Sequence, residues 1–461
     1  MRLTVALVLV LAVLGVAADD NRPLGERTRQ YLTDLVRIDT SNPPGNETKV
    51  ADYLKQVADA HGIPAELQGG DPKRMNFIAR LKGAGKGRPL LLMAHSDVVP
   101  VERAQWTADP FGAQLKDGYI YGRGTQDDKS LLAAELAVMV EMKRRNIKPG
   151  RDIILLSEAD EEAGSTGMEW LIAHQYPKID AEFAINEGGR AVEFKDARLF
   201  EIQTAEKIPT RIILTAKGTA GHGSMPRSDN PTVHVMRAAL KLSDSDQPVI
   251  VNATTRQYLR ELSKISQYSW LDPAMRRRLS DPVTAVATGL LIKAKDPELD
   301  AMLHTTIAPT MMDGSAKINS IPTLAHVQID VRRMPSETKE EVLTRFKQIV
   351  NDPEVDITLA PGQQMPSTEP SSTTSALYIA IQKAIGRMYP KDASVQYMSP
   401  GATDGSYLRS KGMGVYGAPI FLREAGESRA HGNDERISPK SLEDGVELLW
   451  QIVLEAAGSG T

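Results

Sequence analysis

The sequence predicts an α/β protein in which a large domain with a central mixed sheet is interrupted by a smaller domain. Short apolar strands alternate with amphipathic helices from about residue 24 to residue 206, as is typical of α/β folds. Between about 207 and 360 the order becomes β-α-β-β-α-β, the split βαβ arrangement of ferredoxin-like domains. A segment rich in Pro, Ser and Thr, 361–372, ends that pattern, and the first domain resumes after it.

The composition is that of a globular protein, and it excludes several classes of function. The chain has 461 residues, of which 41% are hydrophobic and 25% charged, and its formal net charge is −4. This balance does not point to nucleic acid or to an anionic membrane surface as a partner. The chain has no cysteine, so it has neither a disulfide framework nor a thiol nucleophile. Any metal ion must therefore be held by carboxylates and by the eight histidines.

Residues 1–18 are predicted to be a signal peptide. Arg2 is basic, residues 5–16 form an apolar core, and small residues precede Asp19, which is the pattern of a cleaved secretory segment. The apolar run is short for a membrane span; an uncleaved anchor is the alternative. We therefore expect a secreted or periplasmic protein that has no membrane contact beyond this segment.

Helices of the large domain are expected where apolar residues recur at helical spacing, and strands where short apolar runs are bounded by turn residues. The part before the insertion is predicted to contain helices 24–38 and 47–61, strands 76–81, 90–94 and 119–121, helix 131–142, and strands 152–157 and 182–185. The part after it is predicted to contain helix 375–388, a tight loop at 400–405, strand 413–416, a polar loop at 429–436 and helix 441–455.

The smaller domain is expected to contain four strands and two helices, with an additional segment between them. The strands are predicted at 211–217, 306–312, 325–332 and 355–359, and the helices from residue 230 and at 337–350. The additional segment, 244–304, is rich in charged residues and helix formers.

Histidine and carboxylate side chains follow three successive buried strands of the large domain. His95 and Asp97 end the first, Glu161 and Glu162 follow the second, and Glu187 follows the third. Taken singly, each has an ordinary explanation, such as a hydrogen-bonded histidine or a solvated acidic loop. Their recurrence at strand ends predicts instead a shared site at one edge of the sheet.

A fourth acidic segment comes directly after the glycine-rich loop 122–124. Asp127 and Asp128 precede the helix that begins near residue 129, where a single aspartate would serve as an N-cap. Two in succession exceed what a cap needs, so we assign this segment to the same site.

Five motifs in a fixed order make the chain resemble the M20 metallopeptidases, a family that includes aminoacylase, carboxypeptidase G, carboxypeptidase S and succinyl-diaminopimelate desuccinylase. The motifs are His95-Ser-Asp97, Gly122-Arg-Gly-Thr-Gln-Asp127-Asp128-Lys129, Asp160-Glu161-Glu162-Ala-Gly164, Asn186-Glu187-Gly-Gly and His431-Gly-Asn-Asp-Glu435. The resemblance implies a zinc-peptidase-like catalytic domain formed by 19–206 and 361–461. It also implies a ferredoxin-like lid and dimerisation domain at 207–360, and therefore a homodimer.

The resemblance also implies a role for each residue of the metal site. Asp127 would bridge two Zn²⁺ ions, or Co²⁺ or Mn²⁺ in their place. One site would be completed by His95 and Glu187, and the other by Glu162 and His431. Glu161 would be the general base, and Asp97 would orient His95 through a hydrogen bond. The peptide bond between Asp127 and Asp128 would be cis.

Four further residues match family positions that act on the substrate. His222, in the segment Gly221-His222-Gly-Ser-Met, would reach the active site of the partner subunit and stabilise the oxyanion; an ordinary loop histidine is the alternative. Asn319 and Arg332 would bind the free carboxylate of the substrate. Arg332 alternates with acidic and polar residues on one strand face, so an ordinary surface arginine is the alternative. Gly401 would lie in the substrate loop.

The sequence therefore predicts a secreted di-zinc hydrolase that cleaves a peptide bond next to a free carboxylate, as a carboxypeptidase or a dipeptidase. An N-acyl-amino-acid amidohydrolase is the alternative, because both substrates carry that carboxylate. A non-catalytic binding protein is a remote third interpretation, which the presence of Glu161 and of every expected ligand opposes. The segment 244–304 departs from shorter lids in the family and leaves substrate size and dimer geometry open.

Overall fold

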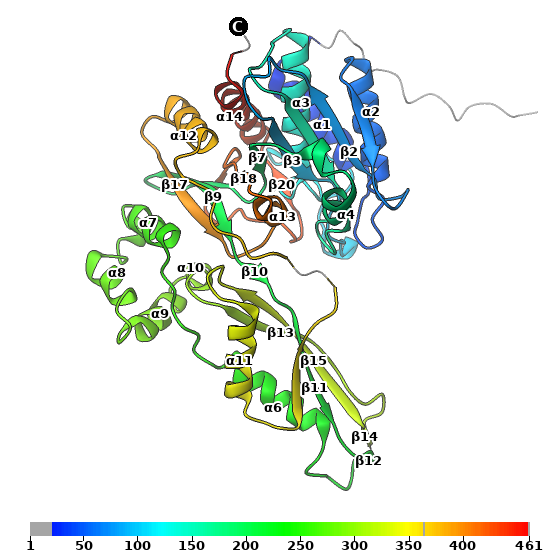
Figure 1. Cartoon of the computed structure of the whole chain (residues 1–461), viewed down its shortest axis with the longest axis vertical. Helices are drawn as coiled ribbons and strands as arrows, with labels where there is room; N and C mark the ends of the chain where they lie inside the picture. Colours follow the sequence, from blue (N-terminus) through cyan, green and yellow to red (C-terminus); the bar gives the residue numbers. More distant parts are fainter. Residues whose placement is uncertain (1–20, 363–364, 460–461) are drawn as a thin grey trace, which may run out of the picture.

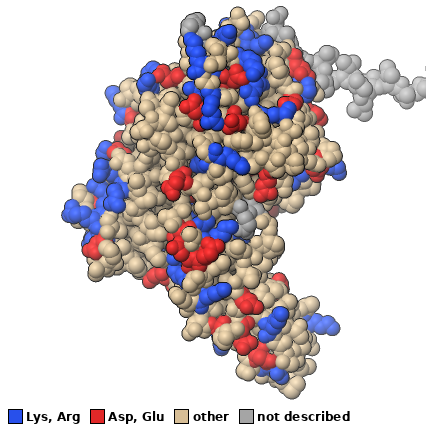
Figure 2. Space-filling model, viewed as in Figure 1, with Lys and Arg blue, Asp and Glu red and all other residues tan. Residues whose placement is uncertain are grey.

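The computed structural model describes residues 21–362 and 365–459, and they form a large lobe and an elongated smaller lobe (Figure 1). The predicted signal peptide, 1–18, lies outside the described residues. Within them, no helix combines the length and apolar character needed to cross a membrane. Acidic and basic side chains are mixed over the face shown in Figure 2, as the small net charge predicts.

A ten-stranded mixed sheet forms the centre of the large lobe, which confirms the predicted α/β domain with a central mixed sheet. Strands β6, β3, β7 and β18 are neighbours and run parallel, whereas both flanks contain antiparallel pairs. The order is β1 (Ala65–Gln68), β2 (Asn76–Leu81), β6 (Ile153–Glu158), β3 (Leu90–His95), β7 (Phe183–Asn186), β18 (Gly414–Gly417), β9 (Arg198–Glu206), β8 (Arg190–Glu193) and β19 (Leu422–Glu424), with β17 (Ala393–Ser399) paired to β9. The sequence analysis missed β1, β8, β9, β17 and β19.

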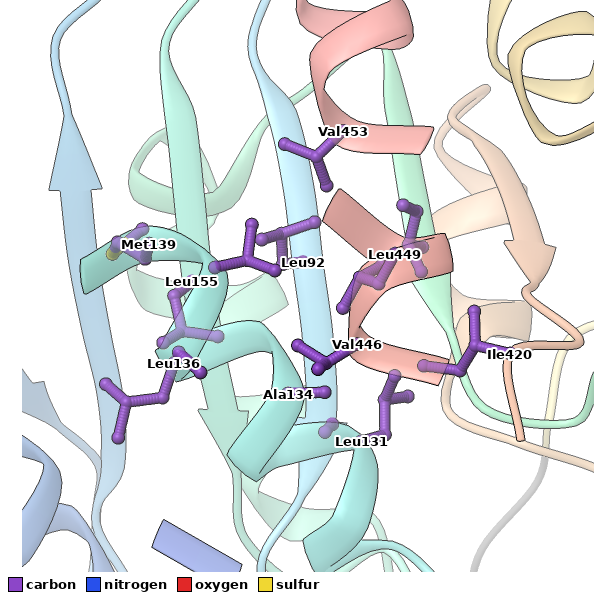
Figure 3. Close-up of a cluster of buried hydrophobic side chains, with 14 of the residues drawn as sticks. Leu92, Leu131, Ala134, Leu136, Met139, Leu155, Ile420, Val446, Leu449 and Val453 are labelled. Carbon is purple, nitrogen blue, oxygen red and sulfur yellow. The ribbon is translucent and has the colours of Figure 1, made fainter. Parts of the chain in front are cut away.

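Helices cover both faces of this sheet. One face packs against α1 (Leu24–Val36), α2 (Thr48–Ala60), α3 (Lys129–Arg144), α12 (Ala376–Met388) and α14 (Pro439–Ala457), and the other against α4 (Thr166–His174), α5 (Tyr176–Ile179) and α13 (Gly405–Ser410). Figure 3 shows Leu92 and Leu155 of the sheet beside apolar side chains of α3 and α14. Because α3 lies between the sheet and other helices, it is buried nearly all round, as its uniformly apolar sequence predicts.

The smaller lobe contains a second, antiparallel sheet with two helices. Its strands lie in the order β13 (Thr306–Asp313), β15 (Leu324–Arg333), β11 (Ile212–Lys217) and β16 (Val355–Leu359), with β10 (Ile208–Pro209) also paired to β15. Helices α6 (Pro231–Ser243) and α11 (Lys339–Val350) share one core with the sheet. Burial alternates along β15, so Arg332 lies on its more exposed face as predicted.

Two smaller sheets complete the strand pairing. One joins β12 (Gly221–His222) to β14 (Ser320–Ile321), and the other joins β20 (Arg436–Ile437), β5 (Tyr119–Tyr121) and β4 (Gln114–Lys116).

The segment 244–304 is helical, but it does not pack on the sheet of the smaller lobe. Its α-helices are α7 (Ala253–Leu262), α8 (Pro273–Leu279), α9 (Ala285–Lys293) and α10 (Pro297–Ala301). Tyr258 and Leu262 of α7 share a core with Leu199 of β9 and Tyr397 of β17. The insertion therefore packs on the large lobe, at the side of the main sheet that carries β9 and β17.

Candidate active site

The carboxyl ends of β6, β3 and β7 meet at one edge of the large sheet. β3 pairs in parallel with both β6 and β7, so the three strands end side by side. His95 is the last residue of β3, Glu187 directly follows β7, and the acidic loop that contains Glu161 and Glu162 follows β6. The expectation that these side chains share one edge is confirmed.

The carboxylate of Asp127 lies between two histidines. Its Oδ1 is 2.9 Å from Nε2 of His95, and its Oδ2 is 3.1 Å from Nε2 of His431. Nε2 of His431 is also 3.1 Å from Oε1 of Glu162. The peptide bond between Asp127 and Asp128 is cis, as the resemblance implies. Each oxygen of Asp127 thus faces a different histidine.

Two overlapping groups of side chains are close enough to share a metal ion. Ligand atoms of His95, Glu161 and Glu187 lie within 4.8 Å of one another, and so do those of His95, Asp127 and Glu162. Imidazole nitrogens and carboxylate oxygens are the donors that Zn²⁺, Co²⁺ and Mn²⁺ accept in proteins.

The electrostatics of the cluster favour positive charge. Burial and then repulsion from Glu161 raise the pKa of Glu187 well above its usual range. Hydrogen bonds to Asp127 and Glu162 raise the pKa of His431 to about 10. A cation would remove the repulsion among these buried carboxylates, so the residues fit a pair of divalent cations.

Asp97 supports the site through contacts that differ in part from the expected ones. Nδ1 of His95 is 3.0 Å from the main-chain carbonyl oxygen of Asp97, whereas the Asp97 carboxylate is 3.6 Å away, which is too long for a hydrogen bond. That carboxylate instead accepts hydrogen bonds from the main-chain N–H groups of Glu161, at 3.2 Å, and Glu162, at 3.1 Å. The main chain of Asp97 therefore orients His95, and its side chain positions the acidic loop.

Glu435 is a supporting residue to which sequence reasoning assigned no role. Its buried carboxylate accepts hydrogen bonds from the main-chain N–H groups of Gly124, Gln126 and Asp127, at 2.6–3.1 Å, and from Nη1 of Arg123 at 2.7 Å. It thereby fixes the loop that carries Asp127. The sequence contained one signal, since Glu435 ends the same motif that begins at His431, but it did not show which groups the carboxylate would bind.

Replacing Glu435 with alanine is expected to lower the free energy of unfolding by about 3–5 kcal/mol, because the Arg123 guanidinium would remain buried without a counter-charge. Both side chains are almost fully buried. Equilibrium denaturation of the purified variant measures the loss. Glu447→Ala, at an exposed position on α14, is the control and should change stability by less than about 0.5 kcal/mol. An equally small loss for Glu435→Ala would contradict the assigned role.

Two of the four predicted substrate residues lie far from the metal ligands of the same chain. His222 is exposed on β12, and Asn319 adjoins it, because the N–H of Gly223 donates to the carbonyl oxygen of Asn319 at 2.8 Å. Figure 1 places β12 and β14 at the end of the smaller lobe that is remote from β3 and β7. The structure therefore brings His222 and Asn319 together but separates them from His95 and Asp127.

The other two predicted substrate residues lie elsewhere. Arg332 is near the end of β15, where its Nε donates to Oδ2 of Asp330 at 3.1 Å and its side chain is 28% exposed. Gly401 follows β17, and its N–H donates to Oγ of Ser399 at 3.0 Å.

A cavity of about 250 Å³ opens beside the metal ligands. Asp127 and Glu187 line it, together with Arg190 and Arg423 of the large lobe and Glu298 of the insertion. Pro400, next to Gly401, also borders it. A small substrate can therefore reach the cluster through a cavity whose walls include the inserted helices.

A mixed α/β sheet with this cluster of histidines and carboxylates at the ends of its parallel strands defines a metal-dependent hydrolase. The chain belongs to peptidase family M20/M25/M40, whose sequence model matches residues 91–455. The resemblance found in the sequence is confirmed, and so is the conclusion that the protein is a hydrolytic enzyme.

Two relatives and two solved structures illustrate the similarity. The chain is 28% identical over 444 residues to N-fatty-acyl-amino acid synthase/hydrolase PM20D1 of Homo sapiens, covering 93% of this chain and 87% of that protein. It is 28% identical over 385 residues to a probable succinyl-diaminopimelate desuccinylase of Staphylococcus aureus, covering 82% and 84%. The fold is similar to that of an M20 family metallo-carboxypeptidase from Sulfolobus solfataricus, with a TM-score of 0.69, 20% identity and coverage of 92% and 98%. It is also similar to that of human carnosine dipeptidase 1, with a TM-score of 0.64, 16% identity and coverage of 95% and 99%.

Proposed function

We propose that this protein is a di-zinc hydrolase that cleaves an amide bond next to a free carboxylate of its substrate. The observation that carries the proposal is the position of Asp127, whose two carboxylate oxygens face His95 and His431 at 2.9 and 3.1 Å. A carboxylate that faces two histidines in this way can bridge two ions. His95 and Glu187 would hold one ion, and Glu162 and His431 the other.

Each remaining group has a role in this reaction. When bound, two Zn²⁺ ions, or Co²⁺ or Mn²⁺ in their place, would supply a Lewis acid for the scissile carbonyl. Glu161 takes the proton from the attacking water and delivers it to the leaving nitrogen. The Asp97 carboxylate holds the main chain of Glu161 in place. Glu435 holds the loop of Asp127.

The substrate is a peptide that ends in a free carboxylate or an N-acyl amino acid. Both place a carboxylate beside the scissile amide, and Arg332 and Asn319 would bind it. Similarity to a probable carboxypeptidase S-like protein of Dictyostelium discoideum, 25% identical over 376 residues, supports the peptide class. Similarity to the human N-fatty-acyl-amino acid synthase/hydrolase, over 93% of this chain, supports the N-acyl class.

We further propose that residues 207–360 form a ferredoxin-like lid through which two chains dimerise, and that 19–206 with 361–461 form the catalytic domain. The antiparallel order β13-β15-β11-β16 with two helices supports the lid. In the described part of the chain β13 pairs with β15 alone, so one of its edges is open. Exposed apolar side chains on β13 and α6, such as Met311 and Leu240, support an interface there.

Secretion after cleavage of residues 1–18 remains a prediction.

Hydrolysis by the zinc-loaded protein tests the proposed reaction. The substrates are dipeptides, longer peptides with a free C-terminus, and N-acyl amino acids with short and long acyl chains. We expect cleavage of at least one class, its loss when a chelator removes the ions, and its return when Zn²⁺ is restored. Absence of cleavage in every class, with two ions bound, would contradict the proposal and favour the binding-protein interpretation.

A further inference from the structure

Arg423, on β19, borders the cavity beside the metal ligands. No carboxylate among the described residues forms an ion pair with it. It lines the cavity that Asp127 and Glu187 also border, and it lines two adjoining cavities as well. The one hydrogen bond that its side chain makes within the described part of the chain is a long one, from Nη1 to Oε1 of Gln126 at 3.4 Å. A guanidinium in this position has most of its donors available for a ligand.

The neighbouring arginine in the same cavity is paired with two carboxylates. Arg190 donates through Nε to Oε2 of Glu201 at 2.6 Å, and its Nη1 pairs with Oε1 of Glu298. Its guanidinium also lies over the ring of Tyr397, 4.5 Å from the centroid. Burial, and then the charge of Arg190, lower the pKa of Arg423, whereas Glu201 and Glu298 raise it. Because those two carboxylates pair with Arg190, Arg423 rather than Arg190 has guanidinium donors available for an anion.

Arg423 contacts Gln126, a side chain that the main chain holds in place. Nε2 of Gln126 donates to the carbonyl oxygens of Glu427, at 3.1 Å, and Arg436, at 2.8 Å. Gln126 directly precedes Asp127, so the same short segment places a candidate metal ligand and contacts Arg423. The guanidinium of Arg423 lies on the wall of the cavity that Asp127 also lines, in which the scissile amide would lie.

We propose that Arg423 binds a carboxylate of the substrate and that Glu298 of the insertion keeps Arg190 in an ion pair. This proposal rests on the function proposed above. A planar guanidinium binds a carboxylate through two parallel hydrogen bonds. The carboxylate belongs either to the amino-acid side of the scissile amide or to a dicarboxylic acyl group such as succinyl. Arg423 is thus a specificity residue of the catalytic domain, separate from Arg332 of the smaller lobe.

Matched substrate pairs test this role in Arg423→Gln and Arg423→Lys. One pair is an N-acyl amino acid and its carboxamide, and the other is an N-succinyl and an N-butanoyl derivative of the same amino acid. For the pair whose carboxylate binds Arg423, we expect Arg423→Gln to raise KM for the acid about 10- to 100-fold, as for loss of a charged hydrogen bond. KM for the uncharged partner should change little, and so should kcat. Arg423→Lys should reverse part of the increase in KM for the acid. The affected pair identifies the source of the carboxylate.

Arg198→Gln is the matched control, because Arg198 is half-exposed, pairs with Glu193 and borders an outer cavity but not the one beside the metal ligands. Calorimetric binding of succinate and of leucine, neither of which has an amide bond to cleave, to the zinc-loaded protein provides a readout without turnover, and we expect Arg423→Gln to weaken at least one. The inference would be overturned if Arg423→Gln left the preference for the acid over its uncharged partner unchanged in both pairs while Arg332→Gln abolished that preference. The proposed reaction would still stand in that case. If the wild-type protein cleaves nothing, the proposed reaction fails, and the calorimetry alone decides whether Arg423 binds carboxylates.

Discussion

Replacing Glu161 with alanine is expected to lower kcat about 10²- to 10⁴-fold while both metal ions remain bound, because a general base contributes a factor of this size. The retention of both ions is a strong test of this role, because the carboxylate of Glu161 lies within 4.8 Å of ligand atoms of His95 and Glu187. Geometry therefore allows Glu161 to be a ligand as well as a base. Measuring kcat together with metal content per chain separates the two roles.

Glu162→Ala is the matched control for this experiment, since it removes the adjacent carboxylate, which faces His431 at 3.1 Å. We expect this variant to lose metal as well as activity. If Glu161→Ala lost an ion and Glu162→Ala kept both, the two roles would have to be exchanged. Normal turnover by Glu161→Ala would remove it from the mechanism altogether.

Replacing His222 with alanine is expected to lower kcat about 10²- to 10³-fold, the usual effect of removing one oxyanion donor, without changing metal content. His222 lies at the remote end of the smaller lobe (Figure 1), so it can act only on the site of another chain or after a large movement of the lobe. Elemental analysis and steady-state kinetics measure both quantities. Loss of metal in this variant would instead make His222 a ligand.

Mixing two inactive variants distinguishes these possibilities. A dimer of one His222→Ala chain and one Glu161→Ala chain contains one site that combines an intact Glu161 with an intact His222 from the other chain. We therefore expect activity to return on mixing, up to about half of the wild-type value per mixed dimer if the two sites act independently. Failure to recover activity, in dimers shown to have exchanged chains, would mean that His222 serves its own site.

The positions of most metal-site residues follow from short-range features of the sequence. The apolar runs of β3, β6 and β7 are continuous because both faces of these parallel strands are buried. Polar side chains at the ends of such strands must emerge at the edge of the sheet. For this reason the strand pattern alone is enough to assign His95, Glu161, Glu162 and Glu187 to one site. In the same way, the alternation along β15 predicted the face of Arg332.

The strands β9 and β17 were missed because their pattern depends on partners distant in the sequence. β9 buries Glu201, Gln203, Thr204 and Glu206, which interrupt any apolar pattern. The carboxylate of Glu201 is bound by Tyr258 of the insertion, at 2.6 Å, and that of Glu206 by Arg409 of α13, at 2.7 Å. Burying such groups is possible only when a partner satisfies each one, and the local sequence does not show where those partners are.

The α/β class, the family and the kinds of side chain at the metal site follow from the amino-acid sequence, because periodicity and motif order are properties of short segments. Three features emerged only from the folded chain: the insertion packs on the large lobe, Glu435 holds the loop of Asp127, and Arg423 faces the cavity with no carboxylate of the described residues paired to it. Each of these depends on which distant residues meet, as when Arg123 pairs with Glu435, 312 positions further along the chain. Such contacts form because folding must pair buried charges wherever their partners lie in the sequence.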